Sequence, residues 1–191
     1  MKKMTDEAAK AVLAGPSDGG GLMSIDKNLS PWQILGVAIR SEVDAEDFYA
    51  RLQAKVKNVQ LGQKLRFLAG EEAHHKTILE RVLAQRYPDK PAEAPASSLL
   101  PPVGFSLPDE AGVPDLFVAA LEAEKISEAY YNEAAGRVED EAGRHILAYL
   151  GRVERSHQAM LNSEIDLIRT FPDYYEVEDF HIGQDLFHVG P

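Results

Sequence analysis

The sequence predicts an all-α protein, a four-helix bundle in which a long crossover joins two repeated antiparallel helix pairs. Apolar residues recur at helical spacing in four long segments. The polar residues that repeat with them are Glu42, Glu72 and His75, which return 82 positions later as Glu124, Glu154 and His157. A single shared offset indicates two copies of one helix pair.

The first helix pair follows an N-terminal arm. Residues 1–29 contain a Gly-rich break, so we expect a flexible arm there. A helix is predicted from 31 to about 57, because Ser30 is a good N-cap and Gln33 completes a capping box. A second helix is predicted over 59–86 after a very short connection, which makes the two helices antiparallel neighbours.

The second helix pair follows a segment rich in proline, residues 87–113, which is too long for a tight turn and can traverse the bundle. Helices are predicted over about 114–138 and 141–170, so the bundle spans 30–170. Residues 171–191 form an acidic tail rich in aromatic residues, which we expect to pack on the bundle or on a partner.

The amino-acid composition argues against several classes of function. The formal net charge of −11 argues against binding to nucleic acid or to an anionic membrane surface. The absence of cysteine excludes disulfides and thiol nucleophiles and suits a cytoplasmic protein. We see no apolar run long enough to span a membrane and no signal peptide.

The middle of the second predicted helix carries two polar residues on an apolar stripe. Leu68 and Leu79 lie on this stripe at heptad spacing, before and after Glu72 and His75. Leucines would be expected at the positions that Glu72 and His75 occupy. A buried carboxylate needs a partner, because its desolvation costs several kcal/mol. A buried ion-pair layer without metal is the alternative, but the inner stripes contain no lysine or arginine to neutralise the acids.

Together the two pairs supply four carboxylates and two imidazoles, the composition of a di-metal carboxylate site in a four-helix bundle. The predicted metal ligands are Glu42, Glu72, His75, Glu124, Glu154 and His157. Iron or manganese suits this donor set, and zinc is also compatible with it. We expect each ion to receive one Glu-x-x-His pair, with two carboxylates bridging and two terminal.

Other residues could also act at the metal site, but the sequence supports their roles less strongly. Glu46 and Glu128 repeat at the same offset and could be extra ligands, proton carriers or hydrogen-bond acceptors for the histidines, with partly exposed helix side chains as the alternative. Tyr49 and Tyr131 also repeat and could hydrogen-bond a ligand or supply an electron near the site. For the tyrosines, an ordinary core position with a satisfied hydroxyl is the competing interpretation.

Two other Glu-x-x-His pairs occur in the sequence. One is Glu71–His74, which lies off the apolar stripe. The other is Glu178–His181 in the tail, where Asp185–His188 follows seven residues later and a packed or solvated tail is the alternative to a second metal site.

At these residues the chain resembles the rubrerythrin branch of the ferritin-like superfamily. The second-helix segment GEEAHHKTIL, the fourth-helix segment VERSHQAML, and Glu42 followed by Tyr49 resemble that family's motifs over about 30–170. The resemblance implies a ferritin-like bundle whose six repeated residues bind two iron ions. It also implies reduction of hydrogen peroxide or reaction of ferrous iron with dioxygen.

Two departures from the family pattern qualify the resemblance. Rubrerythrins proper carry a rubredoxin-like domain with four cysteines; this chain has none, so we expect a separate electron donor. They also carry an additional third-helix carboxylate where this chain has Ser127. The family's redox-linked exchange between that carboxylate and a histidine therefore does not carry over directly.

The leading functional hypothesis is a di-iron peroxidase or ferroxidase that consumes a small-molecule oxidant in oxidative-stress defence. The alternative is an iron-binding or storage-related protein with little turnover. A third hypothesis is an interaction module that docks through its tail. We expect a homodimer, because such bundles often pair through their long helices.

Overall fold

Four long helices make up most of the described part of the protein, which in this computed structural model comprises residues 25–90 and 112–171. They are α2 (Pro31–Lys55), α3 (Val59–Arg86), α4 (Val113–Arg137) and α5 (Glu141–Thr170). The closest packing is between α2 and α3 and between α4 and α5. The first two helices therefore form one hairpin and the last two form a second. The predicted four-helix bundle is confirmed.

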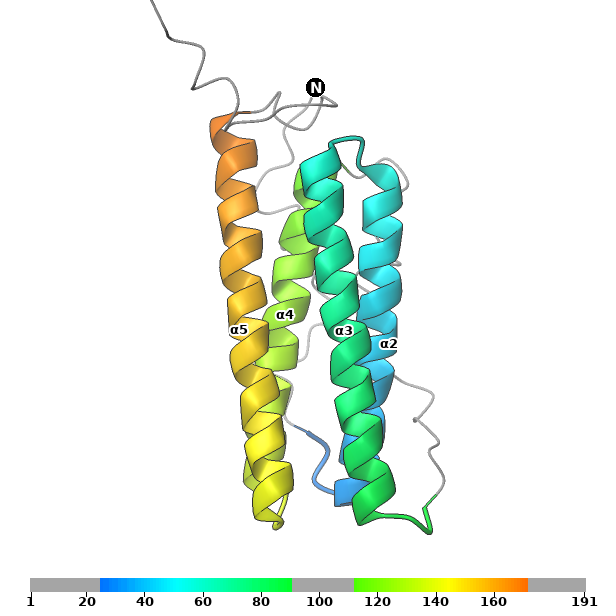
Figure 1. Ribbon diagram of the computed structural model, residues 1–191. Coiled ribbons are helices and arrows are strands. Elements are labelled where there is room, and N and C mark those ends of the chain that lie inside the picture. Colours follow the sequence, from blue (N-terminus) through cyan, green and yellow to red (C-terminus); the bar gives the residue numbers. More distant parts are fainter. Residues whose placement is uncertain (1–24, 91–111, 172–191) are drawn as a thin grey trace, which may run out of the picture.

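The connection between the hairpins joins opposite ends of the bundle. In Figure 1, α3 ends at the bottom of the bundle and α4 begins at the top. Most of the predicted crossover, residues 91–111, lies outside the described residues. So do 1–24 of the expected arm and 172–191 of the tail, including the candidate ligands Glu178, His181, Asp185 and His188.

The last residues of the expected arm are held against α4. Ile25 is buried, and its backbone N–H donates to Oε1 of Glu133 over 3.0 Å. Arg137 donates to the carbonyl oxygens of Asp26 over 2.9 Å and Leu29 over 3.0 Å. One guanidinium offers several donors and so can satisfy several carbonyls of a short turn. These contacts attach residues 25–29, the last part of the expected arm, to the bundle.

Local capping explains where the helices start. The backbone N–H of Ser30 donates to Oε1 of Gln33 at the start of α2, over 3.0 Å. Asn58 accepts a hydrogen bond from the N–H of Leu61 at the start of α3, over 3.0 Å. Such caps satisfy backbone groups that have no partner within the helix.

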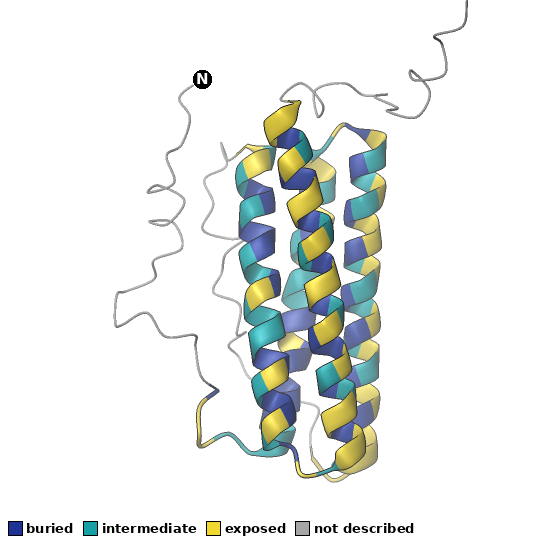
Figure 2. Cartoon of the chain, turned by 90° about the vertical axis from the view of Figure 1, so that its left-hand side faces the viewer, coloured by how far each residue is buried: buried dark blue, intermediate teal, exposed yellow. Residues whose placement is uncertain are grey.

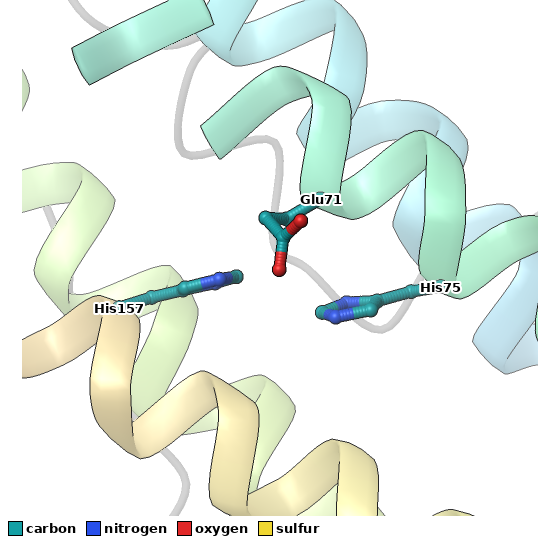
Figure 3. A group of neighbouring side chains, drawn as sticks. All are labelled: Glu71, His75 and His157. Atoms are coloured by element: carbon teal, nitrogen blue, oxygen red, sulfur yellow. The ribbon is translucent and has the colours of Figure 1, made fainter. Parts of the chain in front are cut away.

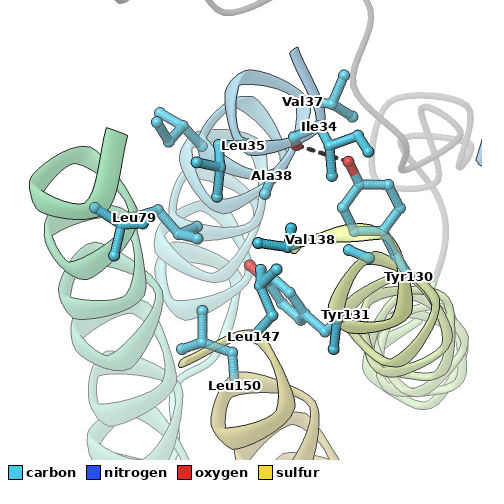
Figure 4. Packing of buried hydrophobic residues seen from close by; sticks show 14 of the residues in the cluster. Ile34, Leu35, Val37, Ala38, Leu79, Tyr130, Tyr131, Val138, Leu147 and Leu150 are labelled. Atoms are coloured by element: carbon cyan, nitrogen blue, oxygen red, sulfur yellow. Dashed lines mark hydrogen bonds between the residues drawn. The ribbon is translucent and has the colours of Figure 1, made fainter. Parts of the chain in front are cut away.

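The bundle interior contains two apolar clusters with a polar layer between them. One cluster includes Ile34, Leu79 and Leu147, and Figure 4 shows them among buried side chains that helices of both hairpins contribute. The other includes Leu65 and Leu161, nearer the opposite end of the bundle. Figure 2 shows buried residues on the inner faces of the helices and exposed ones outside. None of the four described helices has a segment long and apolar enough to cross a membrane.

Candidate metal centre

The polar layer consists of the six predicted ligands. They are Glu42 from α2, Glu72 and His75 from α3, Glu124 from α4, and Glu154 and His157 from α5. All six are almost completely buried, at 4% exposure or less. The helix period brings Glu-x-x-His residues onto one face, and the leucines before and after them bury that face. The structure thus brings together every residue of the predicted ligand set.

The two inner carboxylates each face both histidines. Glu72 has Oε2 3.1 Å from Nδ1 of His75 and Oε1 3.4 Å from Nδ1 of His157. Glu154 has Oε1 3.3 Å from Nδ1 of His75 and Oε2 3.4 Å from Nδ1 of His157. Each carboxylate therefore directs one oxygen toward each half of the centre, which is the arrangement expected of bridging ligands.

The two outer carboxylates each face one histidine. Oε2 of Glu42 is 3.6 Å from Nδ1 of His75, and Oε2 of Glu124 is 3.4 Å from Nδ1 of His157. The layer therefore contains two overlapping groups of possible ligands, within each of which the ligand atoms lie within 4.8 Å of one another. The first group is Glu42, Glu72, His75 and Glu154, and the second is Glu72, Glu124, Glu154 and His157.

Two tyrosines hold the remaining oxygens of the outer carboxylates. The hydroxyl of Tyr49 on α2 donates to Oε1 of Glu124 on α4, and that of Tyr131 on α4 donates to Oε1 of Glu42 on α2. Each tyrosine thus contacts the glutamate of the other repeat and leaves its second oxygen, Oε2, facing a histidine. The hydrogen bonds also link the two hairpins.

Burial and mutual charge shift the acidity of these groups in opposite directions. Burial, reinforced by the charge of Glu72, raises the pKa of Glu42 and Glu124 well above the usual carboxyl range. Burial would also raise the pKa of Glu72 and of Glu154, but the adjacent histidines and outer carboxyl groups outweigh it and lower the pKa of each.

The histidines are shifted by the carboxylates around them. Burial would lower their pKa, but the carboxylates that face the two rings outweigh it, raising the pKa of His157 to about 12 and shifting the pKa of His75 in the same direction. Without a cation, protons on the imidazoles and on the outer carboxyl groups therefore balance the layer. Two divalent cations would neutralise four carboxylates and release those protons.

Several of the possible ligand atoms in the described part of the chain have no hydrogen-bond partner, as expected of atoms that bind metal ions. Glu72 Oε1, Glu154 Oε1 and both ring nitrogens of His157 are buried without a hydrogen-bond partner within the described ranges. Such orphaned groups are rare in proteins and costly. No lysine or arginine is among the buried residues of the described ranges. A cation at each of the two positions would satisfy the two carboxylate oxygens and Nδ1 of His157, the ring nitrogen that faces the carboxylates.

Glu71 lies close to the two histidines of the centre, which its position off the apolar stripe did not predict. It is half-buried, and a carboxylate oxygen lies within 4.8 Å of a ring nitrogen of His75 and of His157. Figure 3 shows the Glu71 carboxylate between the two imidazole rings. The available signal was its position four residues before His75, which places both on one side of α3. Its sequence partner His74 is exposed.

The structure places the other repeated carboxylates differently. Glu128 accepts hydrogen bonds from Nε of Arg155 over 2.8 Å and from Nε2 of Gln158 over 2.7 Å, both across the α4–α5 hairpin. Its carboxylate is thus engaged by side chains other than the histidines it was predicted to serve. Glu46 is half-buried on α2 and belongs to neither ligand group.

Together, two antiparallel hairpins with a buried layer of glutamates and histidines define a ferritin-like four-helix bundle with a candidate metal centre. The chain belongs to the rubrerythrin family, whose family model matches residues 33–165. A hypothetical protein from Pyrococcus furiosus has a similar structure, with a TM-score of 0.68 and 29% sequence identity over 78% of this chain and 98% of that one. No curated protein matches the sequence significantly.

Proposed function

We propose that this protein is a di-iron oxidoreductase that reacts with hydrogen peroxide or dioxygen. The observation that carries the proposal is the orientation of Glu72 and Glu154, which each direct one oxygen toward each histidine. Carboxylates placed in this way can bridge two cations. Membership of the rubrerythrin family supports the same proposal.

The donor set favours iron as the resident metal. Four carboxylates with one imidazole per ion suit hard divalent cations such as ferrous iron or manganese, and zinc is compatible with the same ligands. Bound iron would supply the redox chemistry, in which each ion gives one electron to the oxidant. We propose two irons per chain, one for each of the two overlapping ligand groups.

The protein residues hold the ligands and exclude water. The hydroxyls of Tyr49 and Tyr131 orient the outer carboxylates. The apolar clusters on both sides of the layer keep bulk water out of the centre, which strengthens electrostatic interactions within it. Since the sequence contains no cysteine, we propose that electrons return to the centre from a separate donor.

A stopped-flow experiment tests the activity. Protein loaded with ferrous iron under anaerobic conditions is mixed with hydrogen peroxide, and the absorbance of ferric iron is followed. We expect oxidation at least about tenfold faster than that of the same concentration of free ferrous iron, as for a preorganised metal site. The variant Glu154→Gln, which weakens one bridge, is expected to lose most of this acceleration. Oxidation no faster than that of free iron would exclude the proposed enzyme.

Iron stoichiometry separates the proposal from a storage-related role. Two irons per chain after loading and desalting agree with a catalytic centre. Many irons per chain would require a mineral core and would favour storage. Elemental analysis together with light scattering for the size of the assembly gives both numbers.

A further inference from the structure

Glu71 breaks the two-fold symmetry of the centre. Each of the six buried ligands has a counterpart 82 positions away in the sequence, but at the position that corresponds to Glu71 the chain has Val153. Both residues are half-buried, Glu71 on α3 and Val153 on α5. Of these two corresponding positions, only the one on α3 therefore carries a carboxylate.

The geometry around Glu71 resembles a cation site at the edge of the centre. Its carboxylate and the ring nitrogens of His75 and His157 lie within 4.8 Å of one another, close enough to share one ion. The two rings are stacked, with centroids 5.6 Å apart and an interplanar angle of 16°, so one carboxylate can face both. His157 is 2% exposed, and neither of its nitrogens has a hydrogen-bond partner within the described ranges.

This edge group shares both of its histidines with the inner ligand groups. An ion held by Glu71 therefore already lies beside two residues that also belong to the inner centre. An ion that moves inward and displaces the protons of the layer gains several carboxylate ligands in place of one, so the inner position is the more favourable. Glu71 is half-buried, so solvent reaches part of its side chain. A hollow of about 500 Å³ lined by Lys64, Phe67 and Met160 lies on the same two helices, nearer the start of α3.

We propose that Glu71, His75 and His157 form a transit site, which captures a divalent cation from solvent on the α3–α5 face before the ion moves to the inner ligands. This inference rests on the proposed two-metal centre. It assigns Glu71 to metal uptake and not to the resident ligand set. Removal of Glu71 should therefore slow loading without changing the loaded state.

Cobalt uptake by the metal-free protein tests the transit site without any redox reaction. Co²⁺ is mixed with the protein in a stopped-flow instrument, and its visible absorption is followed to completion. We expect Glu71→Gln to load at least about tenfold more slowly than the wild-type chain, within the range by which local charge alters association rates. The final spectrum and two cobalt ions per chain should be unchanged. Glu80→Gln, an exposed substitution on the same helix, is the matched control for the lost charge.

Transfer of the carboxylate to the other hairpin gives a second, independent readout. Glu71→Val reproduces the residue found on α5 and should load slowly, whereas the double variant with Val153→Glu should recover most of the wild-type rate. Equal rates for the wild type and Glu71→Gln would overturn the transit site. A cobalt stoichiometry below two in Glu71→Gln would also overturn it, by making Glu71 a resident ligand. If the wild-type chain itself bound fewer than two ions, the proposed centre would fail instead.

Discussion

Tyr49 and Tyr131 show how individual side chains orient the candidate centre. Each donates its hydroxyl to the outer glutamate of the opposite repeat, so one oxygen of that glutamate is held and the other faces a histidine. Burial, reinforced by the charge of Glu124, raises the pKa of Tyr49 well above its usual value. Tyr49 therefore remains a hydrogen-bond donor across the physiological pH range.

Substitution of Tyr49 by phenylalanine should weaken metal binding. The variant keeps the ring in the core but leaves Oε1 of Glu124 without its donor, and loss of such a supporting hydrogen bond typically costs about tenfold to 100-fold in metal affinity. A competition titration with a chelator measures the change. Tyr130→Phe is the control, because that hydroxyl donates over 2.7 Å to the carbonyl oxygen of Ile34 and not to a ligand. Equal effects of the two substitutions would contradict the assigned role.

Asp140, at the start of α5, both caps this helix and connects it to α3. Asp140 accepts a hydrogen bond from the N–H of Gly143 over 2.7 Å, which caps the helix. The same carboxylate group is 2.9 Å from a guanidinium nitrogen of Arg86 at the end of α3. One side chain therefore caps α5 and links it to the other hairpin, at the end of the bundle where both helices meet.

Replacement of Asp140 by alanine is expected to destabilise the fold by about 1–2 kcal/mol, because an N-cap of this kind contributes about that much. Urea denaturation followed by circular dichroism measures the loss. Asp140→Asn keeps a capping oxygen and removes only the ion pair, so it should lose less than half as much. A cost for asparagine as large as that for alanine would show that the ion pair dominates, contrary to this expectation.

The whole molecule consists of two hairpins whose shared interior contains acids. Two apolar clusters hold the hairpins together, but the layer between them must be neutralised by protons or by cations. Raised pKa values of Glu42, Glu124, His75 and His157 mean that the folded, metal-free chain retains protons that the unfolded chain gives up. Folding, protonation and metal binding are therefore linked.

The metal-free protein should become less stable as pH rises from about 6 to 8. The pKa of histidine in the unfolded chain is about 6.5, whereas the surrounding carboxylates raise the pKa of folded His157 to about 12. The stabilising contribution of the protonated ring is therefore complete below the first value and is lost as pH rises towards the second. The raised carboxyl groups act in the same direction. Thermal unfolding with a chelator at several pH values measures the slope. Bound metal replaces the protons, so the loaded protein should lose this slope, and a metal-free melting temperature that rises with pH would contradict the linkage.

Much of this architecture was predictable from the chain alone. The observed bounds of α3 and α5 agree with the predicted ones, and those of α2 and α4 differ by no more than two residues. Caps and helical periodicity are local properties, so one sequence suffices to find them. The six predicted ligands converge because a repeated polar pair on an apolar stripe has to be buried against its copy.

Other features depended on distances between helices. Glu71 is off the apolar stripe, and only the approach of α5 places His157 beside it. Glu128 repeats in sequence as faithfully as the ligands do, yet Arg155 and Gln158 engage it. Spacing along one helix indicates which face a residue occupies, but not which side chain from another helix reaches that face.

The sequence alone was enough to establish the four helices, the two-fold repeat and the set of buried acids and histidines, since all of these follow from periodicity within single helices. The packing of one hairpin on the other decided which oxygen faces which histidine, which glutamate each tyrosine holds, and that Glu71 stands at the edge of the centre. These pairings join residues far apart in the chain, and their distances arise only when the side chains of both hairpins fill one interior.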